Sequence, residues 1–192
     1  MKNKILKYFL IAVSVLLTAF TVGSAYADTY GDTKTGYYLE DKVKLSAECA
    51  VLMEAQSGRV LFASNASAQR AMASTTKIMT ALVALDSSDP GNIVSIPPEA
   101  VGTEGSSAYL TAYEKIPLID LLYALMLQSA NDAAIAIAVG VGGDTAAFVD
   151  MMNQKASELG LKNTHFMNPH GLYEDGHFTS AYDLAVIMNT AM

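Results

Sequence analysis

The sequence has no tryptophan, only one cysteine and few charged residues. With Cys49 alone, no internal disulfide can form, so the fold must be held together by its core. Charged residues make up 16% and apolar residues 52% of the 192 positions, which excludes a disordered polymer and supplies enough apolar surface for a core. Basic residues number 12 against 19 acidic ones. The net charge of the whole chain is −7.

The amino terminus has the pattern of a secretory signal. Three lysines among the first seven residues precede an uncharged apolar run over residues 8–22, and Ala25-Tyr26-Ala27 offers the small residues that a signal peptidase requires. The apolar run is short for a membrane span, which needs about 20 residues. We therefore predict that residues 1–27 are a signal peptide and that the protein is exported, with an uncleaved N-terminal anchor as the alternative. Cleavage would leave nine basic and 19 acidic residues, a net charge of −10. Such a surface repels nucleic acid and anionic lipid, so neither is expected as a partner.

The mature chain is predicted to begin with a polar leader, residues 28–44, followed by one structured region, residues 45–192. Periodicity and turn residues predict strands over residues 50–55, 60–63 and 93–96. They predict helices over residues 74–85, 117–127, 133–141, 145–159 and 180–192. Two of the helices are apolar on nearly every side, which is typical of a protein interior. No strand is expected after Ile96, so the first two strands form a hairpin that lacks sheet partners. The fold class is α+β with an incomplete sheet.

The strongest chemical signal is Ser74-Thr75-Thr76-Lys77 at the start of a predicted helix. Ser74 alone could be a helix N-cap, but a lysine in the first turn opposes the helix dipole and stands where a capping box has Glu or Gln. Residues three apart share a helix face, so Lys77 can reach the Ser74 hydroxyl. The dipole and burial both favour a neutral amine, which can accept a proton. The pattern therefore predicts Ser74 as a nucleophile and Lys77 as its general base.

A second signal is Ser129-x-Asn131, a polar break between two helices that both look buried. Buried polar groups are costly unless they have partners. Asn131 and Asp132 could simply cap the following helix, but that interpretation leaves Ser129 unexplained. The functional interpretation makes the Ser129 hydroxyl a proton relay between Lys77 and a leaving amine, and the Asn131 amide a holder of a substrate peptide group.

With their flanks, these two motifs resemble the serine penicillin-binding proteins, which are related to the β-lactamases, and among them the D-alanyl-D-alanine carboxypeptidases of low molecular mass. The matching segments are residues 72–82, 125–134, 168–172 and 176–185, and the likeness extends over residues 45–192. One minor departure is Ala71, where the family often has proline. The resemblance implies a transpeptidase fold of the penicillin-binding-protein and β-lactamase type, in which a helical cluster packs on an antiparallel sheet.

The resemblance also implies an activity. Ser74 would attack the peptide bond between the two terminal D-alanines of a peptidoglycan stem peptide, and β-lactam antibiotics would acylate the same serine. The reaction needs no cofactor. The resemblance further places His170 and Asp183 beside the active site in supporting roles. The histidines at 165, 170 and 177 match no common zinc spacing, so no metal site is expected.

The family's third motif, Lys-Thr-Gly, follows Ser-x-Asn on a strand. This chain has Lys34-Thr35-Gly36, but it precedes the nucleophile in the polar leader, and we interpret it as coincidence. The motif that acts in catalysis is expected beyond Met192. Residues 45–192 are then the N-terminal portion of a catalytic domain and inactive alone. Many family members also carry a C-terminal membrane anchor, which would bring the protein to the membrane.

Three alternatives remain open. A class A-like β-lactamase needs a glutamate after Ser-x-Asn, where only Glu158 and Glu174 are present, and it would turn over penicillin steadily. A non-catalytic penicillin-binding cell-wall module would not need the intact motif residues. An endopeptidase acting on cross-links would share the same groups, so the sequence does not separate it from a carboxypeptidase.

Overall fold

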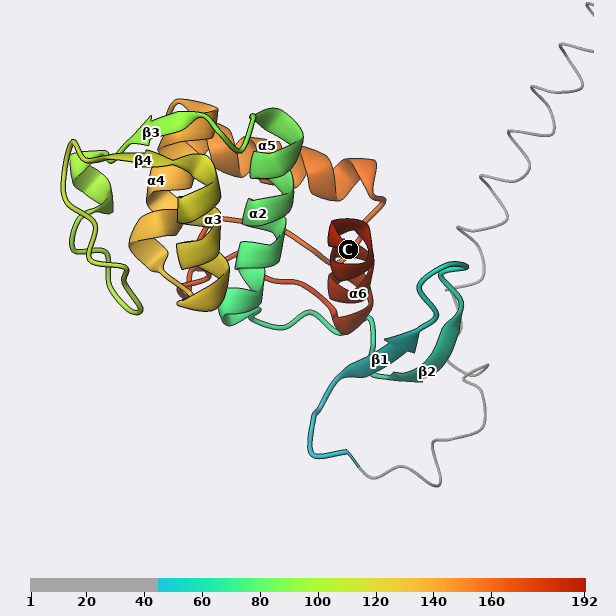
Figure 1. The fold of residues 1–192 in the computed structure, drawn as a ribbon. Coiled ribbons are helices and arrows are strands. Elements are labelled where there is room, and N and C mark those ends of the chain that lie inside the picture. Colours follow the sequence, from blue (N-terminus) through green and yellow to red (C-terminus); the bar gives the residue numbers. More distant parts are fainter. Residues whose placement is uncertain (1–44) are drawn as a thin grey trace, which may run out of the picture. The chain divides into compact units, whose positions relative to one another are not determined.

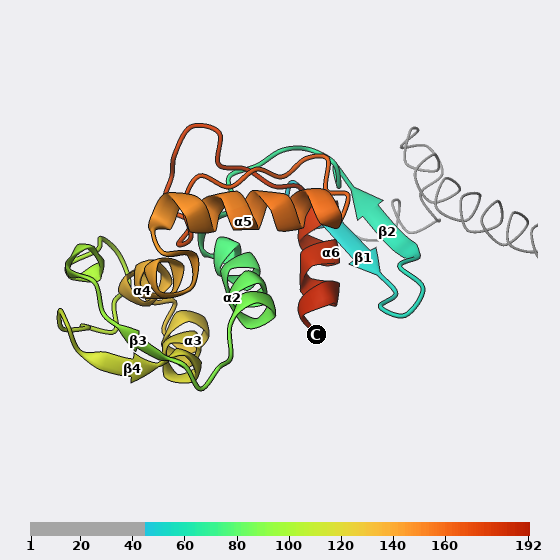
Figure 2. The ribbon, with the colours of Figure 1, turned by 90° about the horizontal axis from the view of Figure 1, so that it is seen from above.

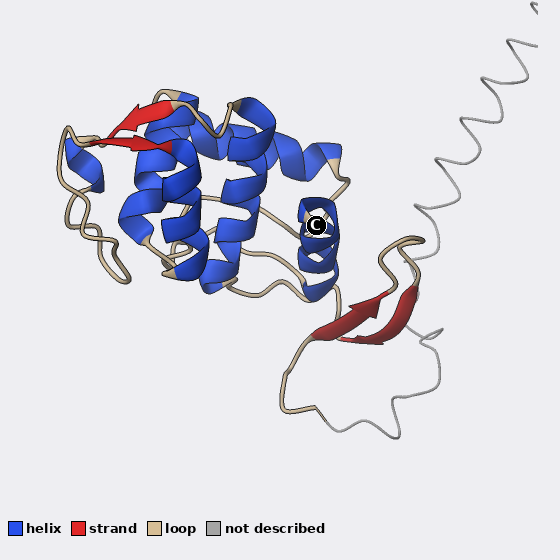
Figure 3. Ribbon diagram, in the orientation of Figure 1, coloured by secondary structure: helices blue, strands red, loops and turns tan. Residues whose placement is uncertain are grey.

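The computed structural model describes residues 45–192; the predicted signal peptide, the polar leader and Lys34-Thr35-Gly36 lie outside the described residues. Figures 1 and 3 show helices with two short antiparallel strand pairs, the α+β composition that the sequence predicts. The elements, in chain order, are β1 (Ala50–Met53), β2 (Val60–Ser64), the 3-10 turn η1 (Ala73–Thr75), α2 (Thr76–Ser87), β3 (Ile93–Ser95), the 3-10 turn η2 (Pro98–Ala100), β4 (Lys115–Pro117), α3 (Leu118–Leu127), α4 (Asn131–Gly142), α5 (Thr145–Glu158) and α6 (Ala181–Ala191).

The predicted hairpin is present as the antiparallel pair β1 and β2. Its turn is built around Glu54, whose carboxylate accepts hydrogen bonds from the backbone amides of Gln56 (3.0 Å) and Ser57 (2.7 Å). Gly58 closes the turn with a φ of +67°, a conformation that favours glycine. Within residues 45–192 the hairpin pairs with no third strand, and α6 packs against β1.

The expectation of no strand after Ile96 is wrong. β4 pairs antiparallel with β3, and Val94 lies opposite Ile116 in the register. The strand has three residues and ends at Pro117, which also precedes the first residue of α3. So short a segment has no room for an alternating pattern, and only its pairing with β3 makes it a strand.

Helix α4 lies at the centre of the helical cluster, and every residue from Asn131 to Ala138 is buried. It packs against α2, α3 and α5, and Figure 2 shows α5 crossing near α2 and α4. The alanines of α4 allow this close packing because they add little volume. In the described part of the chain no single helix is long and apolar enough to cross a bilayer, and α4 with α5 reaches that composition only as a pair bent by 85°.

Helix α3 is only half buried, so the prediction that it lies wholly in the interior is wrong on one side. Its inward face is buried at Leu118, Leu121, Leu122 and Leu125. Its other face exposes Ile119, Tyr123, Met126 and Leu127. Nothing in residues 45–192 covers that second face, and sequence periodicity alone could not tell the two apolar faces apart.

Helix α5 has the ends that its sequence predicts. Asp144 caps its start by accepting a hydrogen bond from the Ala147 amide (2.7 Å). At its end Gly160 has a φ of +69°, and the amides of Gly160 and Leu161 bond back into the last turn, which is a Schellman motif. These contacts set where the chain leaves α5 and begins the loop toward the site.

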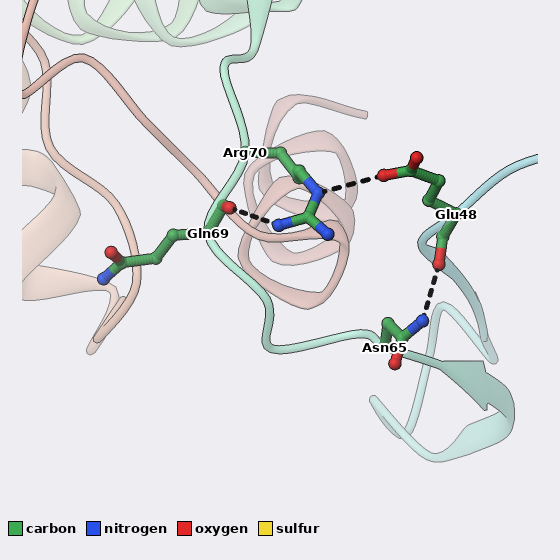
Figure 4. A network of polar contacts seen from close by, with 4 residues as sticks. All are labelled: Glu48, Asn65, Gln69 and Arg70. Atoms are coloured by element: carbon green, nitrogen blue, oxygen red, sulfur yellow. Dashed lines mark hydrogen bonds and ion pairs between the residues drawn. The ribbon is translucent and has the colours of Figure 1, made fainter.

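The segment that leads from β2 to Ser74 is held by polar contacts at its surface (Figure 4). The Arg70 Nε atom lies 3.4 Å from a Glu48 carboxylate oxygen, Arg70 also donates to the Gln69 carbonyl, and the Asn65 amide donates to the Glu48 carbonyl (2.9 Å). The ion pair is exposed and contributes little. More important, Arg70 and Thr179 exchange two backbone hydrogen bonds, which bring the segment before α6 alongside the segment before α2.

Candidate active site

Ser74 lies in the 3-10 turn η1, not at the first residue of an α-helix. The sequence predicts a helix from Ser74, whereas α2 begins at Thr76, and the Ser74 side chain makes no capping bond. Ala73, just before it, has a φ of +46°, which is unfavourable for a residue with a Cβ. The Thr76 hydroxyl donates to the Ala73 carbonyl (2.8 Å) and holds this turn. Ser74 is exposed, and its hydroxyl is not used as a cap.

Lys77 lies beneath Ser74 with 2% of its surface exposed. Its Nζ atom is 3.1 Å from the Ser74 Oγ atom and donates to the His170 carbonyl at 2.6 Å. No carboxylate within residues 45–192 forms an ion pair with it. Burial without a counter-charge lowers the pKa of Lys77 to about 8. A neutral Lys77 amine can donate to His170 and still direct its lone pair at the Ser74 hydroxyl proton.

A loop over residues 168–177 docks on the start of α2. The buried Thr80 hydroxyl donates to the Pro169 carbonyl (2.6 Å), next to the contact between Lys77 and His170. Gly171 has a φ of +92°, and a Cβ at this position would lie 1.9 Å from the Ala73 carbonyl oxygen. The loop backbone therefore packs directly on the turn that presents Ser74. Sequence reasoning missed Thr80, although a polar stripe at 76, 77 and 80 on an otherwise apolar helix is a usable signal.

Of the two predicted supporting residues, His170 bonds directly to Lys77, and Asp183 bonds to other residues. His170 is adjacent and contributes its carbonyl to Lys77, while burial, and then the charge of Lys77, lowers the pKa of its imidazole to about 4. Asp183 is buried and contacts neither Ser74 nor Lys77. Its carboxylate accepts from the Asn163 amide (2.8 Å) and the Thr164 hydroxyl (2.8 Å), so it anchors the beginning of the segment that carries the loop.

The Ser129 turn lies between α3 and α4, and Ser129 has a φ of +55°. Its hydroxyl makes no hydrogen bond within residues 45–192, so the predicted relay to Lys77 is not a direct contact here. The capping interpretation of Asn131 is wrong, because α4 begins at Asn131 itself and has no side-chain cap at the preceding residue. Asp132 is already inside the first turn, where its carboxylate accepts a hydrogen bond from the Ala133 amide (2.9 Å). The Asn131 Nδ2 atom donates to the Glu104 carbonyl (2.6 Å), whereas its buried Oδ1 atom has no partner in the described structure.

Asp132 is a site residue whose role the sequence did not reveal. It is 1% exposed, and its carboxylate accepts from the Ser107 hydroxyl (2.7 Å) and the amides of Ala108 (3.0 Å) and Leu110 (3.1 Å). Burial tends to raise the pKa of Asp132, but these hydrogen bonds outweigh it and hold the pKa below its usual value. Asp132 thereby fixes residues 107–110 against the first turn of α4.

Replacing Asp132 with asparagine is expected to destabilise the fold by about 2–3 kcal/mol, because an amide nitrogen would face backbone N–H donors in a buried site. Urea unfolding at neutral pH measures this. The matched control is Ser107→Ala, which removes one of the bonds and should cost about 1 kcal/mol. Equal stabilities of the Asn variant and the unsubstituted protein would show that the carboxylate does not hold the loop. The stabilisation should be full above the unfolded carboxyl pKa of about 3.9 and disappear as the pH falls through the lower folded value.

The remaining acidic and imidazole groups are engaged separately. Glu158 is exposed on α5 and pairs with Lys155, and the Glu174 carboxylate accepts from the Asn168 side chain (3.1 Å). His165 bonds to the Gly176 carbonyl, and His177 bonds to the Met167 amide and to the Thr76 hydroxyl. In the part of the chain that the structure describes, no three His, Cys, Asp or Glu side chains cluster as metal ligands would.

Comparison with known proteins identifies the family. Residues 36–192 match the family described as D-alanyl-D-alanine carboxypeptidase, peptidase S11. The chain belongs to this family. It is 42% identical over 146 residues to the D-alanyl-D-alanine carboxypeptidase DacF of Bacillus subtilis, covering 73% of this chain and 38% of that protein. It is 37% identical over 185 residues to DacA of Escherichia coli, covering 91% and 45%. The chain thus spans less than half the length of these two relatives.

The fold comparison agrees with the family. The structure of DacD from Francisella tularensis superposes with a TM-score of 0.74 at 37% identity, covering 77% of this chain and 37% of that one. Penicillin binding protein 6B from Escherichia coli gives 0.74 at 35% identity, covering 80% and 52%. The predicted fold class, with helices packed against antiparallel strands in a penicillin-binding-protein fold, is confirmed. The roles of Ser74, Lys77, Ser129, Asn131, His170 and Asp183 stay predictions.

Proposed function

We propose that the protein is a serine-type D-Ala-D-Ala carboxypeptidase in which Ser74 forms an acyl-enzyme with a peptidoglycan stem peptide. The observation behind this proposal is the 3.1 Å contact between the exposed Ser74 hydroxyl and the buried Lys77 amine, whose pKa burial lowers to about 8. A serine hydroxyl alone is a weak nucleophile, and an adjacent neutral amine activates it. Relatives at 37–42% identity named D-alanyl-D-alanine carboxypeptidases support the substrate class.

The proposed reaction has two steps. In the first, Lys77 takes the Ser74 proton while the oxygen attacks the carbonyl between the two D-alanines, and the terminal D-alanine leaves as an amine after accepting a proton. In the second, water attacks the ester and releases the shortened peptide and Ser74. We assign the Asn131 side-chain oxygen, which is buried without a partner within residues 45–192, to substrate binding, and the Ser129 hydroxyl to proton transfer. β-Lactams would acylate Ser74 in the same way.

The proposal includes the place of action. The pattern of residues 1–27 supports export, and a peptidoglycan substrate lies outside the cytoplasmic membrane, so we place the protein in the cell envelope or outside the cell. A membrane anchor after the region described here would hold it near its substrate.

Labelled penicillin tests the proposal. In the full-length protein we expect one covalent label, and peptide mapping should place it on Ser74. Ser74→Ala should abolish the label, whereas the control Ser157→Ala, at an exposed position of α5, should leave it unchanged. The unsubstituted protein should also release D-alanine from a peptide that ends in D-Ala-D-Ala. A label on another serine contradicts the assignment, and steady consumption of penicillin without D-alanine release would favour a β-lactamase.

A further inference from the structure

His177 is a buried histidine for which the proposed reaction has no use. It is 5% exposed, and its ring packs edge-on against Phe166 with centroids 6.0 Å apart. Its Nε2 atom lies 2.8 Å from the Thr76 Oγ1 atom, and its Nδ1 atom accepts a hydrogen bond from the Met167 amide at 3.0 Å. The imidazole therefore joins the loop over residues 168–177 to the first residue of α2.

The available donors allow only one direction for each hydrogen bond in this series and only one tautomer of the His177 ring. The Met167 amide can only donate, so the Nδ1 atom of His177 carries no proton, and the proton of the neutral ring is on Nε2. That N–H donates a hydrogen bond to the Thr76 hydroxyl oxygen, and the hydroxyl in turn donates its own hydrogen bond to the Ala73 carbonyl at 2.8 Å. The series of bonds runs from the Met167 backbone to the carbonyl immediately before Ser74.

The turn that receives this series is strained. Ala73 has a φ of +46°, a conformation that costs a residue with a Cβ of order 1–3 kcal/mol and persists only where the surroundings impose it. Three features hold the Ala73 carbonyl in place: the backbone N–H of Thr76, the Thr76 hydroxyl, and the backbone of Gly171, which leaves no room for a side chain. The Thr76 rotamer that reaches Ala73 is itself set by His177.

We propose that His177 is a positioning residue for the nucleophile: by donating to Thr76 it fixes the strained Ala73 carbonyl and so directs the Ser74 hydroxyl at Lys77. This inference rests on the proposed function of Ser74. His177 does not touch the Ser74–Lys77 pair, so its effect passes through the Thr76 hydroxyl. The sequence places it 101 residues from Thr76, which explains why spacing could not reveal the link.

The surroundings keep the imidazole neutral, as this arrangement requires. Burial lowers the pKa of His177, Glu174 opposes that shift, and His165 adds to it. His177 in turn contributes to the lowered pKa of His170. A second ring proton would sit on Nδ1 facing the Met167 N–H and would break that contact.

Two amide substitutions, each of which stands in for one ring nitrogen, separate positioning from simple loop packing. In His177→Gln the side-chain amide nitrogen takes the place of Nε2 and can still donate to Thr76. In His177→Asn the amide takes the place of Nδ1 and can bond only toward Met167. We expect the Gln variant to keep most of the wild-type rate of acylation by labelled penicillin. The Asn variant should lose on the order of 10²-fold, because a displacement near 1 Å at a nucleophile has that effect. The loss should fall on the first-order acylation step and not on the affinity of the initial complex.

Thr76 provides the partner experiment. Thr76→Ser retains the hydroxyl and should retain the rate, whereas Thr76→Val removes it with little change of volume and should reproduce the His177→Asn defect. In a Thr76→Val background, His177→Asn should add no further loss, since both substitutions interrupt one path. Independent losses that multiply would overturn the proposal, as would equal rates in the Gln and Asn variants of His177.

Hydrogen exchange makes the test independent of catalysis. The amides of residues 72–77 should exchange faster in His177→Asn than in His177→Gln, and unchanged exchange in both overturns the positioning role. If the unsubstituted protein takes no label at Ser74, the proposed function fails, and the exchange comparison still decides whether His177 holds this turn.

Discussion

Replacing Lys77 with arginine is expected to lower the rate at which penicillin acylates Ser74 by a factor on the order of 10² to 10⁴, the range that a general base contributes. The guanidinium group stays protonated at any working pH, so it cannot take the serine proton. The larger head group would also have to fit between the Ser74 hydroxyl and the His170 carbonyl, which lie 3.1 Å and 2.6 Å from the Lys77 Nζ atom. Stopped-flow or gel-based acylation of the full-length protein measures the rate, with exposed Lys162→Arg as the control.

The pH dependence of the same rate identifies the base. Burial lowers the pKa of Lys77 to about 8, so the neutral fraction of its amine, and with it the acylation rate, should rise with pH and level off above about 8. The folded pKa lies below the unfolded value of about 10.4, so the unfolded chain holds this proton more tightly. The unfavourable contribution of Lys77 to stability should therefore shrink as the pH rises from about 8 to 10.4. A Lys77→Arg variant acylated at the normal rate, or a wild-type rate that is flat from pH 6 to 9, would show that Lys77 is not the base.

Replacing Gly171 with alanine is expected to lower both the stability of the protein and the rate at which Ser74 is acylated. A Cβ at this position would lie 1.9 Å from the Ala73 carbonyl oxygen, and the φ of +92° is itself unfavourable for alanine. The loop over residues 168–172 must move away from η1, which separates the His170 carbonyl from Lys77. We expect a destabilisation of about 3 kcal/mol from strain and overpacking. Acylation should fall on the order of 10²-fold from the displaced turn.

Gly176→Ala is the matched control for this prediction. Gly176 lies in the same loop with a φ of +87°, but a Cβ there would meet nothing closer than the Met167 sulfur at 3.6 Å. The control therefore has the backbone strain without the collision, and it should cost about 1 kcal/mol and leave acylation nearly unchanged. Thermal unfolding and the acylation rate measure both variants. If the two alanines have the same effect on acylation, the contact between Gly171 and Ala73 does not position Ser74.

Local patterns were sufficient for part of the fold. The β1–β2 hairpin and the helices follow from strand alternation, helical periodicity and the Gly, Pro and Asp residues at their boundaries. Asp144 caps the start of α5 and Gly160 terminates it, as their chemistry predicts. The proximity of Ser74 and Lys77 was also predictable, because one helical turn separates them. Where the patterns failed, the feature depended on a distant partner: β4 is a strand only because β3 pairs with it, and α3 is exposed on one apolar face because nothing in residues 45–192 covers it.

The sequence by itself indicated the family and pointed to Ser74 and Lys77 as the candidate reactive pair, because the two residues interact through a single turn whose geometry is local. The tertiary structure alone decided how that pair is held. His170 and Pro169 reach α2 across about 90 residues, and His177 reaches Thr76 across 101, through contacts that involve backbone carbonyls and a ring tautomer. Backbone atoms are the same in every residue, so a sequence cannot show which carbonyl will accept a buried amine. That choice follows from how the loop over residues 168–177 packs on α2, with Gly171 against Ala73.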